Sequence, residues 1–288
     1  MRTGISLPIA APDAALEWAR RIEAGPFDTV AVFDRLVYPC PDPLITLAAV
    51  AGVTSRVTLR SQVLLGALRD PVVLAKQAAT LDLLSGGRFE LGLGLGDRED
   101  DYAAVGLKKT QRGRLLDANV ERLLQVWPGS EQEGALGPVA PPTASAGGPK
   151  LLFGGYSDAA LRRVARWGGG YISNMVPDAE GSIFRKVEAE WAAAGRTGRP
   201  QLLAQVNVAI GSPEVVEEAR RRLTAYYAFL DYPGSYITSQ KISDWMVTSE
   251  QQLQYVLHMC RQSGADELVF MCWSQDLGQV DRIASLLG

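Results

Sequence analysis

The chain has 288 residues, of which 47% are hydrophobic and 21% charged, and its net charge is −3. This composition supports a large core and gives no electrostatic attraction to nucleic acid or to an anionic membrane. The single histidine, His258, excludes a histidine-based metal site, and three cysteines without CxxC spacing argue against a disulfide framework or a structural zinc site. Because prolines break the first apolar run and no run approaches the ~20 residues that span a bilayer, we expect a cytoplasmic protein.

Short apolar runs alternate with longer amphipathic segments along the whole chain, a pattern typical of a parallel sheet with helical crossovers. The predicted strands are Gly4–Pro8, Thr29–Phe33, Val57–Leu64, Phe89–Leu95, Leu151–Gly154, Gly170–Ser173, Leu202–Ile210 and Glu267–Met271. The predicted helices are Pro12–Ala24, Pro43–Val53, Pro71–Leu84, Arg112–Val126, Asp158–Trp167, Asp178–Ala194, Pro213–Phe229, Ser249–Ser263 and Leu277–Leu287.

Eight such units in one chain of this length favour an α/β fold of the closed (β/α)8 type, a TIM barrel formed as one domain over residues 1–288. Two segments interrupt the alternation, Gln132–Pro149 and Leu230–Trp245. Long loops in a compact domain are commonly functional, so we predict that both are insertions that cover the carboxyl-terminal rim of the barrel.

The fourth predicted strand has glycine at every second position, at Gly92, Gly94 and Gly96. Alternate glycines leave one face of a strand without side chains, so a flat ligand ring or another backbone can approach its peptide groups. The alternative is that small residues only taper the inside of the barrel. A dinucleotide-binding fingerprint is not complete, because Asp97 stands where its last glycine belongs and no apolar helix follows.

A turn with features of an anion site follows the fifth predicted strand. Gly154 and Gly155 end the strand, and Ser157 and Asp158 stand where the next helix begins. Backbone amides at a helix N-terminus bind anions, so this turn predicts a phosphate site with a hydroxyl from Ser157. The alternative is that Ser157 or Asp158 only caps the helix.

Charged and aromatic residues follow several predicted strands at the end where barrel active sites gather. Asp34 and Arg35 follow the second strand, Asp97 and Arg98 the fourth, and Trp273 the eighth. Each pair could instead be a surface ion pair. Together they predict a site on one rim.

Four segments carry a resemblance to a known family: DPLITLAAVAGVTSRVTL, DPVVLAKQAATLDLLSGGRFELGLGLG, GGYSDAALRRVARWGGGY and SGADELVF. The chain resembles the bacterial-luciferase-like family of flavin-dependent oxidoreductases over nearly its whole length, most densely between Asp42 and Gly106. The resemblance implies a TIM barrel with FMN or coenzyme F420 across the carboxyl-terminal rim. It also implies a non-prolyl cis peptide in the third strand, near Ser61, Gln62 and Val63.

The resemblance also assigns site residues. The flavin ring would lie on the third and fourth strands, and the phosphate at the turn after the fifth strand; the cofactor-binding residues are Ser61, Gln62, Val63, Gly94, Gly96, Arg98, Gly154, Gly155, Tyr156 and Ser157. The catalytic candidates are Asp34, Arg35 and Asp97, with Arg35 stabilising a developing anion. Relatives have Asp-His where this chain has Asp34-Arg35, a GDGW pattern where it has Gly168–Tyr171, and a phosphate-binding arginine at the position of Leu95.

These residues lead to one hypothesis and two alternatives. The first is a monooxygenase that takes reduced FMN from a separate flavin reductase and uses O2 to oxygenate a small organic substrate. The second is an F420-dependent hydride-transfer enzyme, whose acid–base residue would be Asp34, Asp97 or Tyr102. The third is a cofactor-free binding protein on the same barrel. No metal is expected, and the family resemblance suggests a homodimer packed through barrel helices.

Overall fold

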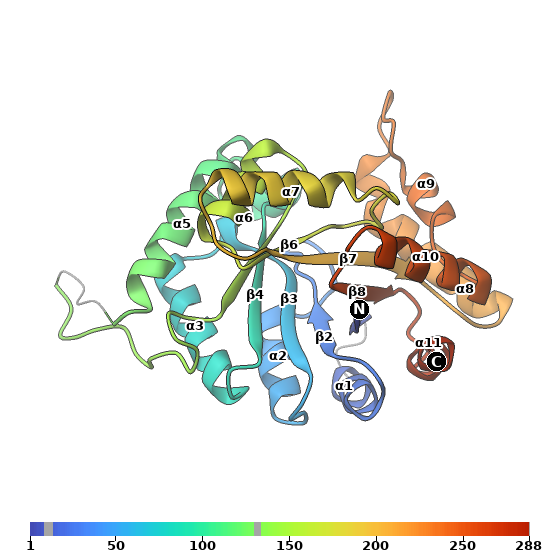
Figure 1. The fold of residues 1–288 in the computed structure, drawn as a ribbon, viewed down its shortest axis with the longest axis horizontal. Coiled ribbons are helices and arrows are strands. Elements are labelled where there is room, and N and C mark those ends of the chain that lie inside the picture. Colours follow the sequence, from blue (N-terminus) through green and yellow to red (C-terminus); the bar gives the residue numbers. More distant parts are fainter. Residues whose placement is uncertain (9–13, 130–133, 288) are drawn as a thin grey trace.

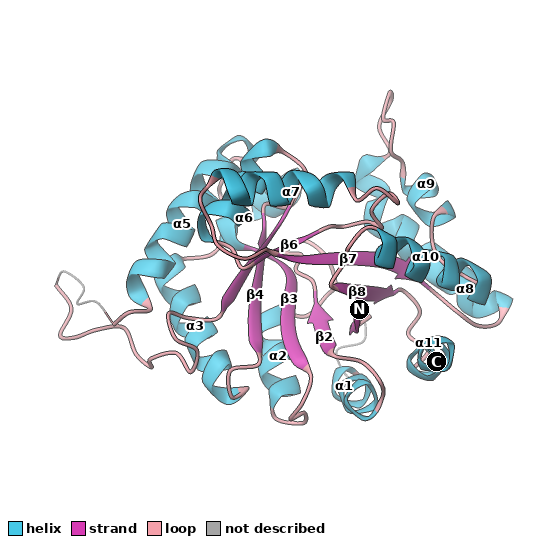
Figure 2. Ribbon diagram, in the orientation of Figure 1, coloured by secondary structure: helices cyan, strands magenta, loops and turns pink. Residues whose placement is uncertain are grey.

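A computed structural model describes residues 1–8, 14–129 and 134–287. Eight parallel strands close into a barrel in the order of the sequence. Helices lie around the outside of the barrel (Figures 1 and 2). The strands are β1 (Arg2–Ser6), β2 (Thr29–Val32), β3 (Thr58–Leu65), β4 (Phe89–Gly94), β5 (Lys150–Gly154), β6 (Gly170–Ile172), β7 (Gln201–Val208) and β8 (Glu267–Cys272). The predicted (β/α)8 barrel is confirmed.

The helices follow the prediction closely. They are α1 (Ala15–Ala24), α2 (Pro43–Ala51), α3 (Pro71–Leu84), α4 (Glu99–Ala104), α5 (Arg112–Val126), α6 (Asp158–Trp167), α7 (Ser182–Ala193), α8 (Pro213–Tyr227), α9 (Ser239–Asp244), α10 (Glu250–Gln262) and α11 (Gly278–Leu287). Three short 3-10 helices are η1 (Gly66–Leu68), η2 (Lys109–Gln111) and η3 (Ala228–Leu230). None of the helices among these described residues combines the length and apolar character that crossing a bilayer requires.

The differences from prediction are local. Pro12, the first residue predicted for α1, lies outside the described residues, and β1 runs over Arg2–Ser6 rather than Gly4–Pro8. The short helix α4 forms where no helix was expected, because three acidic residues in its first turn suit the positive end of the helix dipole. The predicted starts of α2 and α3 hold: each has a proline at the first helical position and an aspartate, Asp42 or Asp70, that caps two amides.

A buried ionic cluster fills the amino-terminal end of the barrel. Arg60 on β3 is fully buried and makes two hydrogen bonds to Glu267 on β8, at 2.8 and 3.0 Å. Its Nε donates to Glu90 on β4 at 2.7 Å. Burial raises the pKa of Glu267, but the charge of Arg60 outweighs it and holds that pKa below its usual range. Paired charges therefore fill this end of the barrel, and the active site is expected at the carboxyl-terminal end.

The two predicted insertions lie at different ends. In the segment before β5, the backbone carbonyl of Ala140 accepts a hydrogen bond from Lys76 of α3, and Ser145 bonds Asp82 near the end of α3. A connection that leads into a strand reaches it at its amino end, so the prediction that Gln132–Pro149 covers the carboxyl-terminal rim is wrong for its described part. The second segment, Leu230–Trp245, does lie at that rim: it follows η3, contains α9, and leads to Val247, which bridges Val208 at the end of β7.

Candidate active site

The predicted site residues come to one end of the molecule. Because all eight strands are parallel, the segments that follow β2, β3, β4, β5 and β8 share the carboxyl-terminal rim. The acidic and basic residues after β2 and β4, and the glycine turn after β5, therefore surround one barrel mouth. Their contacts decide which of them is available for chemistry.

A bulge in β3 shapes one side of the mouth. The register of β3 on β4 shifts at this point, so that Gln62 and Val63 together oppose Gly92. The peptide bond between Gln62 and Val63 is cis, as the resemblance implied. The hydroxyl of Ser61 donates to the carbonyl of Gly92 at 3.0 Å, and the side-chain amide of Gln62 donates to Gln205 on β7 at 3.1 Å. Ser61 and Gln62 are buried, whereas Val63 is half-buried at the mouth.

This bulge explains the alternating glycines of β4. A Cβ added at Gly92 would lie 2.1 Å from the carbonyl oxygen of Ser61, and one at Gly94 would lie 2.4 Å from Cγ2 of Val63. Gly96 also has a φ of +67°, which favours glycine. The sequence allowed either a ligand ring or another backbone to lie against these glycines, and the structure shows the neighbouring strand β3 there. The idea that the glycine face forms an open slot for a ring is wrong, because Val63 covers it.

The turn after β5 lies beside the bulge. A Cβ at Gly154 would be 3.7 Å from Cγ1 of Val63, so the turn and Val63 are neighbours. Gly155 has a φ of +124°, and a Cβ there would be 2.9 Å from Cβ of Ala160. Ser157 caps α6, its hydroxyl accepting from the amide of Ala160 at 3.3 Å. Capping is therefore one observed role of Ser157.

The same turn leaves donors free. In the part of the chain that the structure describes, no acceptor is bonded to the backbone N–H groups of Tyr156, Ser157 or Asp158. The Tyr156 hydroxyl bonds Ser173 at 3.3 Å and also contacts Asn174, and burial raises its pKa. Tyr156 thus reaches across to the segment after β6, while the amides of the turn stay available at the N-terminus of α6.

Asp34 joins the ends of two strands. Its Oδ2 accepts from the amide of Leu65 and from Arg69, both at 3.0 Å, and its side chain is 6% exposed. Burial raises the pKa of Asp34, and the charge of Arg69 opposes that shift. Arg69 is shared with Asp42, 2.9 Å away. The structure therefore places Asp34 in an ionic network that fastens β2 to β3, and its catalytic role stays a prediction.

Arg35 is also paired. Its Nη2 lies 2.8 Å from Oδ2 of Asp101, in a contact where the two side chains are 6% and 1% exposed. The other oxygen of Asp101 accepts from the amides of Leu36 and Val37 at 3.1 and 2.8 Å. Asp101 thereby holds the loop after β2 and compensates the charge of Arg35. The proposed stabilisation of an anion by Arg35 would have to compete with Asp101.

The remaining charged candidates also have partners. Burial raises the pKa of Asp97, but hydrogen bonds from Lys109 and Arg112 outweigh it and lower that pKa. Arg98, expected to hold a phosphate, is ion-paired with Asp100, its Nε donating at 2.9 Å. Its guanidinium carbon also lies 5.5 Å from the ring centre of Phe229. The charge of Arg98 is therefore already compensated.

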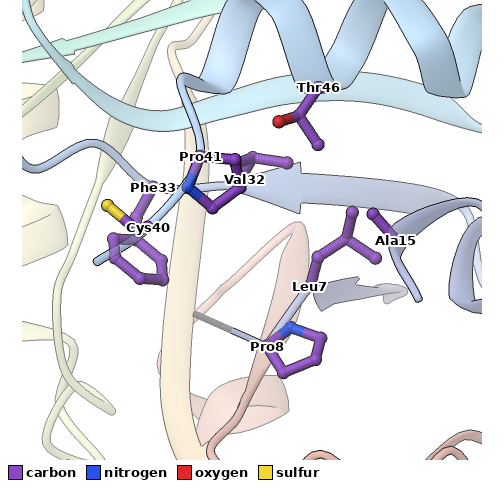
Figure 3. Close-up of a pocket in the computed structure, with 8 residues that line it drawn as sticks. All are labelled: Leu7, Pro8, Ala15, Val32, Phe33, Cys40, Pro41 and Thr46. Carbon is purple, nitrogen blue, oxygen red and sulfur yellow. The ribbon is translucent and has the colours of Figure 1, made fainter. Parts of the chain in front are cut away.

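Two hollows in the described part of the structure differ in size and in place. The pocket in Figure 3, between the ends of β1 and β2, has a volume of about 10 Å³, room for one water molecule. A hollow of about 670 Å³ lies outside the barrel over α6 and α7. Its Arg163 is paired with Asp117, and its Arg166 with Glu121. Within the described residues, no three potential metal-ligating side chains gather.

Comparison with known proteins identifies the family. Residues 1–268 match the family described as luciferase-like monooxygenase. The chain belongs to this family. An uncharacterised protein of Mycobacterium bovis is 32% identical over 170 residues, which cover 57% of this chain and 60% of that protein. An F420-dependent glucose-6-phosphate dehydrogenase of Kribbella flavida is 32% identical over 127 residues, 40% of this chain and 38% of the relative.

A solved structure extends the comparison to the whole fold. The monooxygenase RslO1 from Streptomyces bottropensis has a TM-score of 0.78 at 20% identity, covering 100% of this chain and 97% of its own. The match to the curated Mycobacterium relative spans less than two thirds of that relative's length. The chain therefore shares the luciferase-like barrel fold.

Sequence reasoning missed one side of this luciferase-like mouth. Aromatic residues from the end of α8 and from η3 pack over the ends of β2 and β8, and we call this group the aromatic wall: Phe33, Tyr38, Tyr226, Tyr227, Phe229 and Trp273. Only Trp273 was noted, as a residue after the eighth strand. The available signal was three aromatic residues within four positions at the end of a predicted helix, Tyr226, Tyr227 and Phe229.

The residues of the turn fit the phosphate of the flavin that the family implies. Within the described residues, the backbone N–H groups of Tyr156, Ser157 and Asp158 at the N-terminus of α6 have no acceptor. Val63 offers an apolar surface next to the same turn. Arg98 does not add to this set while it is paired with Asp100.

Proposed function

We propose that this chain is a flavin-dependent monooxygenase that uses reduced FMN and O2 to oxygenate a small organic substrate. The observation that carries the proposal is the juxtaposition of the turn and the bulge: the turn that leads to the free amides of α6 begins at Gly154, beside Val63, on one rim. The description of the matched family, luciferase-like monooxygenase, supports the reaction class.

In this proposal, the amides of Tyr156, Ser157 and Asp158 hold the phosphate, and the positive end of the α6 dipole favours its charge. The bulge of Gln62 and Val63 supports the ring from inside the mouth. When bound, the flavin supplies the oxygen-activating chemistry. The chain positions the substrate, and the segment Leu230–Trp245 together with the aromatic wall keeps water from the mouth.

FMN is preferred over coenzyme F420 because each candidate acid–base residue is already hydrogen-bonded or ion-paired. Hydride transfer to or from a substrate oxygen needs a residue that gives or takes a proton. Asp34 is bonded to Arg69, and Asp97 to Lys109 and Arg112. The hydroxyl of Tyr102 donates to the carbonyl of Leu95, and burial raises its pKa to about 12. The similarity to an F420-dependent dehydrogenase keeps F420 as the second candidate.

Equilibrium titration tests this choice. Purified protein is titrated separately with FMN, with reduced FMN under anaerobic conditions, and with F420. Micromolar binding of reduced FMN that exceeds F420 binding supports the proposal, and the reverse order supports the hydride-transfer enzyme. Binding of neither would favour a cofactor-free protein and would contradict the proposal.

A matched pair of glycine variants tests the phosphate site. Gly155→Ala places a Cβ 2.9 Å from Cβ of Ala160 in the first turn of α6, at a φ of +124°, and should distort the turn that carries the free amides. The control is Gly211→Ala, just before α8, which also combines a strained φ, +156°, with a close contact in the first turn of a helix, Cγ1 of Val215 at 3.2 Å. We expect FMN affinity to fall at least tenfold in the first variant and to stay unchanged in the second. An equal loss of FMN affinity in both variants would contradict the assignment of the phosphate to this turn.

Two partners belong to the proposal. Reduced FMN would come from a separate flavin reductase in the cytoplasm.

We also propose a homodimer packed through barrel helices, because the adjacent helices α2 and α3 leave large aliphatic side chains exposed, such as Ile45 at 73% and Leu84 at 61%. Sedimentation of wild type and of an Ile45→Glu, Leu84→Glu variant tests this: we expect a dimer that the double substitution converts to a monomer, and a monomeric wild type would contradict it.

A further inference from the structure

The aromatic wall is a continuous set of ring contacts at the barrel mouth. Tyr226 is its centre: its ring centre lies 5.6 Å from Phe33, 5.2 Å from Tyr38 and 5.2 Å from Trp273. Tyr227 lies 4.8 Å from Tyr226. Three of these pairs, Phe33–Tyr226, Tyr38–Tyr226 and Tyr226–Tyr227, are edge-to-face, with interplanar angles of 78°, 80° and 80°. Such pairs use the edge of one ring and the face of the other, so further ring surface remains for another aromatic partner.

The wall is not simply a part of the core. Phe33 and Trp273 are buried at 7% and 3% exposure, but Tyr226, Tyr227 and Phe229 remain partly exposed. Burial raises the pKa of Tyr227, and Tyr226 and Tyr156 add to the shift. Tyr156 follows β5, on the other side of the barrel from the strands that carry Phe33 and Trp273. The wall and the phosphate turn therefore face the same mouth.

Two arginines hold the wall in place and are themselves neutralised. The guanidinium of Arg35 lies 5.3 Å from the ring centre of Tyr226 and 5.7 Å from that of Phe229, and Arg98 lies over the same Phe229 ring. Asp101 compensates Arg35, and Asp100 compensates Arg98. The wall thus offers ring surface that is already ordered, and it offers no uncompensated positive charge to an anionic ligand.

We propose that the substrate of this site is a planar aromatic compound without a negative charge, held against the aromatic wall. The inference rests on the proposed function for the place of the reaction, and it adds the substrate class. Each aromatic contact favours an aromatic partner about 2- to 12-fold over an aliphatic one of equal area. Because the rings are already held in place before binding, little binding free energy is spent on ordering these side chains.

A matched pair of probes tests the substrate class. 2-Naphthol and decahydro-2-naphthol share one carbon skeleton and one hydroxyl, but only the first is planar and aromatic. Their affinities are measured by calorimetry on the purified protein, with and without FMN. We expect 2-naphthol to bind about tenfold more tightly.

Variants locate the preference on the wall. Tyr226→Leu and Phe229→Leu each remove a ring and keep an apolar side chain, and we expect either to reduce the preference at least threefold. Tyr226→Phe keeps the ring and should keep the preference. The control is Tyr255→Leu on α10, where a tyrosine that is 62% exposed is removed from a helix outside the wall. If Tyr226→Leu does not fold, Phe229→Leu at the surface of η3 decides the question.

The possible outcomes separate the two proposals. Equal affinity for both probes, or a preference that survives both leucine variants, overturns the substrate class. FMN binding without an aromatic preference overturns this inference and leaves the proposed function intact. An aromatic preference without FMN binding supports the wall as a binding surface and counts against the proposed function.

Discussion

Gly94→Ala tests how the bulge and the fourth strand fit together. The added Cβ would lie 2.4 Å from Cγ2 of Val63, whereas ordinary contact begins at 3.4 Å, so Val63 must move by about 1 Å. Overpacking of this kind costs about 1–3 kcal/mol. The free energy of unfolding should fall by that amount, measured by urea denaturation. Since Val63 would also support the flavin ring, we expect FMN affinity to fall about tenfold in fluorescence titrations.

Two further glycine variants bracket this prediction. Gly137→Ala adds a Cβ with no atom within 4 Å, so stability and FMN affinity should stay at wild-type values. Gly92→Ala sets the Cβ 2.1 Å from a backbone oxygen, which cannot rotate away, and should destabilise more than Gly94→Ala. Wild-type stability and affinity in Gly94→Ala would refute the contact between Val63 and β4 as the reason for glycine here.

Three other predictions concern buried polar groups. Arg60→Met leaves the buried Glu267 with only Arg2, 3.8 Å away, as a counter-charge and should cost about 3–5 kcal/mol at pH 7 by urea denaturation. Because the pKa of Glu267 is lowered in the folded wild type, the ionised carboxylate stabilises the fold above pH 4.5, and this stabilisation is lost as the pH falls. The variant should instead gain stability on acidification. Matching pH profiles of the free energy of unfolding in wild type and variant would contradict this. Tyr102→Phe should cost about 1 kcal/mol and leave the pH dependence of turnover unchanged, and a changed pH profile would restore Tyr102 as an acid–base residue. Asp101→Ala, which leaves Arg35 only the longer contact with Asp100 at 3.9 Å, should cost about 3–5 kcal/mol and weaken 2-naphthol binding but not FMN binding, as calorimetry would show.

The fold was predictable because it depends on local signals repeated along the chain. Apolar runs alternate with helices that start at proline after a capping aspartate, such as Asp42 and Asp70, and parallel strands with helical crossovers close into a barrel at eight units. The same reasoning located the rim, because residues after parallel strands share one end. The family resemblance added the cis peptide between Gln62 and Val63, which no local pattern indicates.

The parts that were missed depend on contacts between distant residues. Asp101 pairs with Arg35, 66 positions away, and the sequence gives no register for such a pair. The glycines of β4 were correctly noted as a bare face, but only the structure shows that Val63 of β3 occupies it. Tyr226 and Phe229 appeared as the end of an ordinary helix because their contacts, Phe33 and Arg35, come from the distant segment that follows β2.

A crystal structure of the protein with bound FMN tests the central claim most directly. The account predicts phosphate oxygens about 2.7–3.2 Å from the amide nitrogens of Tyr156, Ser157 or Asp158, with the ring against Val63 at the barrel mouth. FMN bound instead in the hollow over α6 and α7, or at the mouth with its phosphate away from the turn after β5, would contradict it.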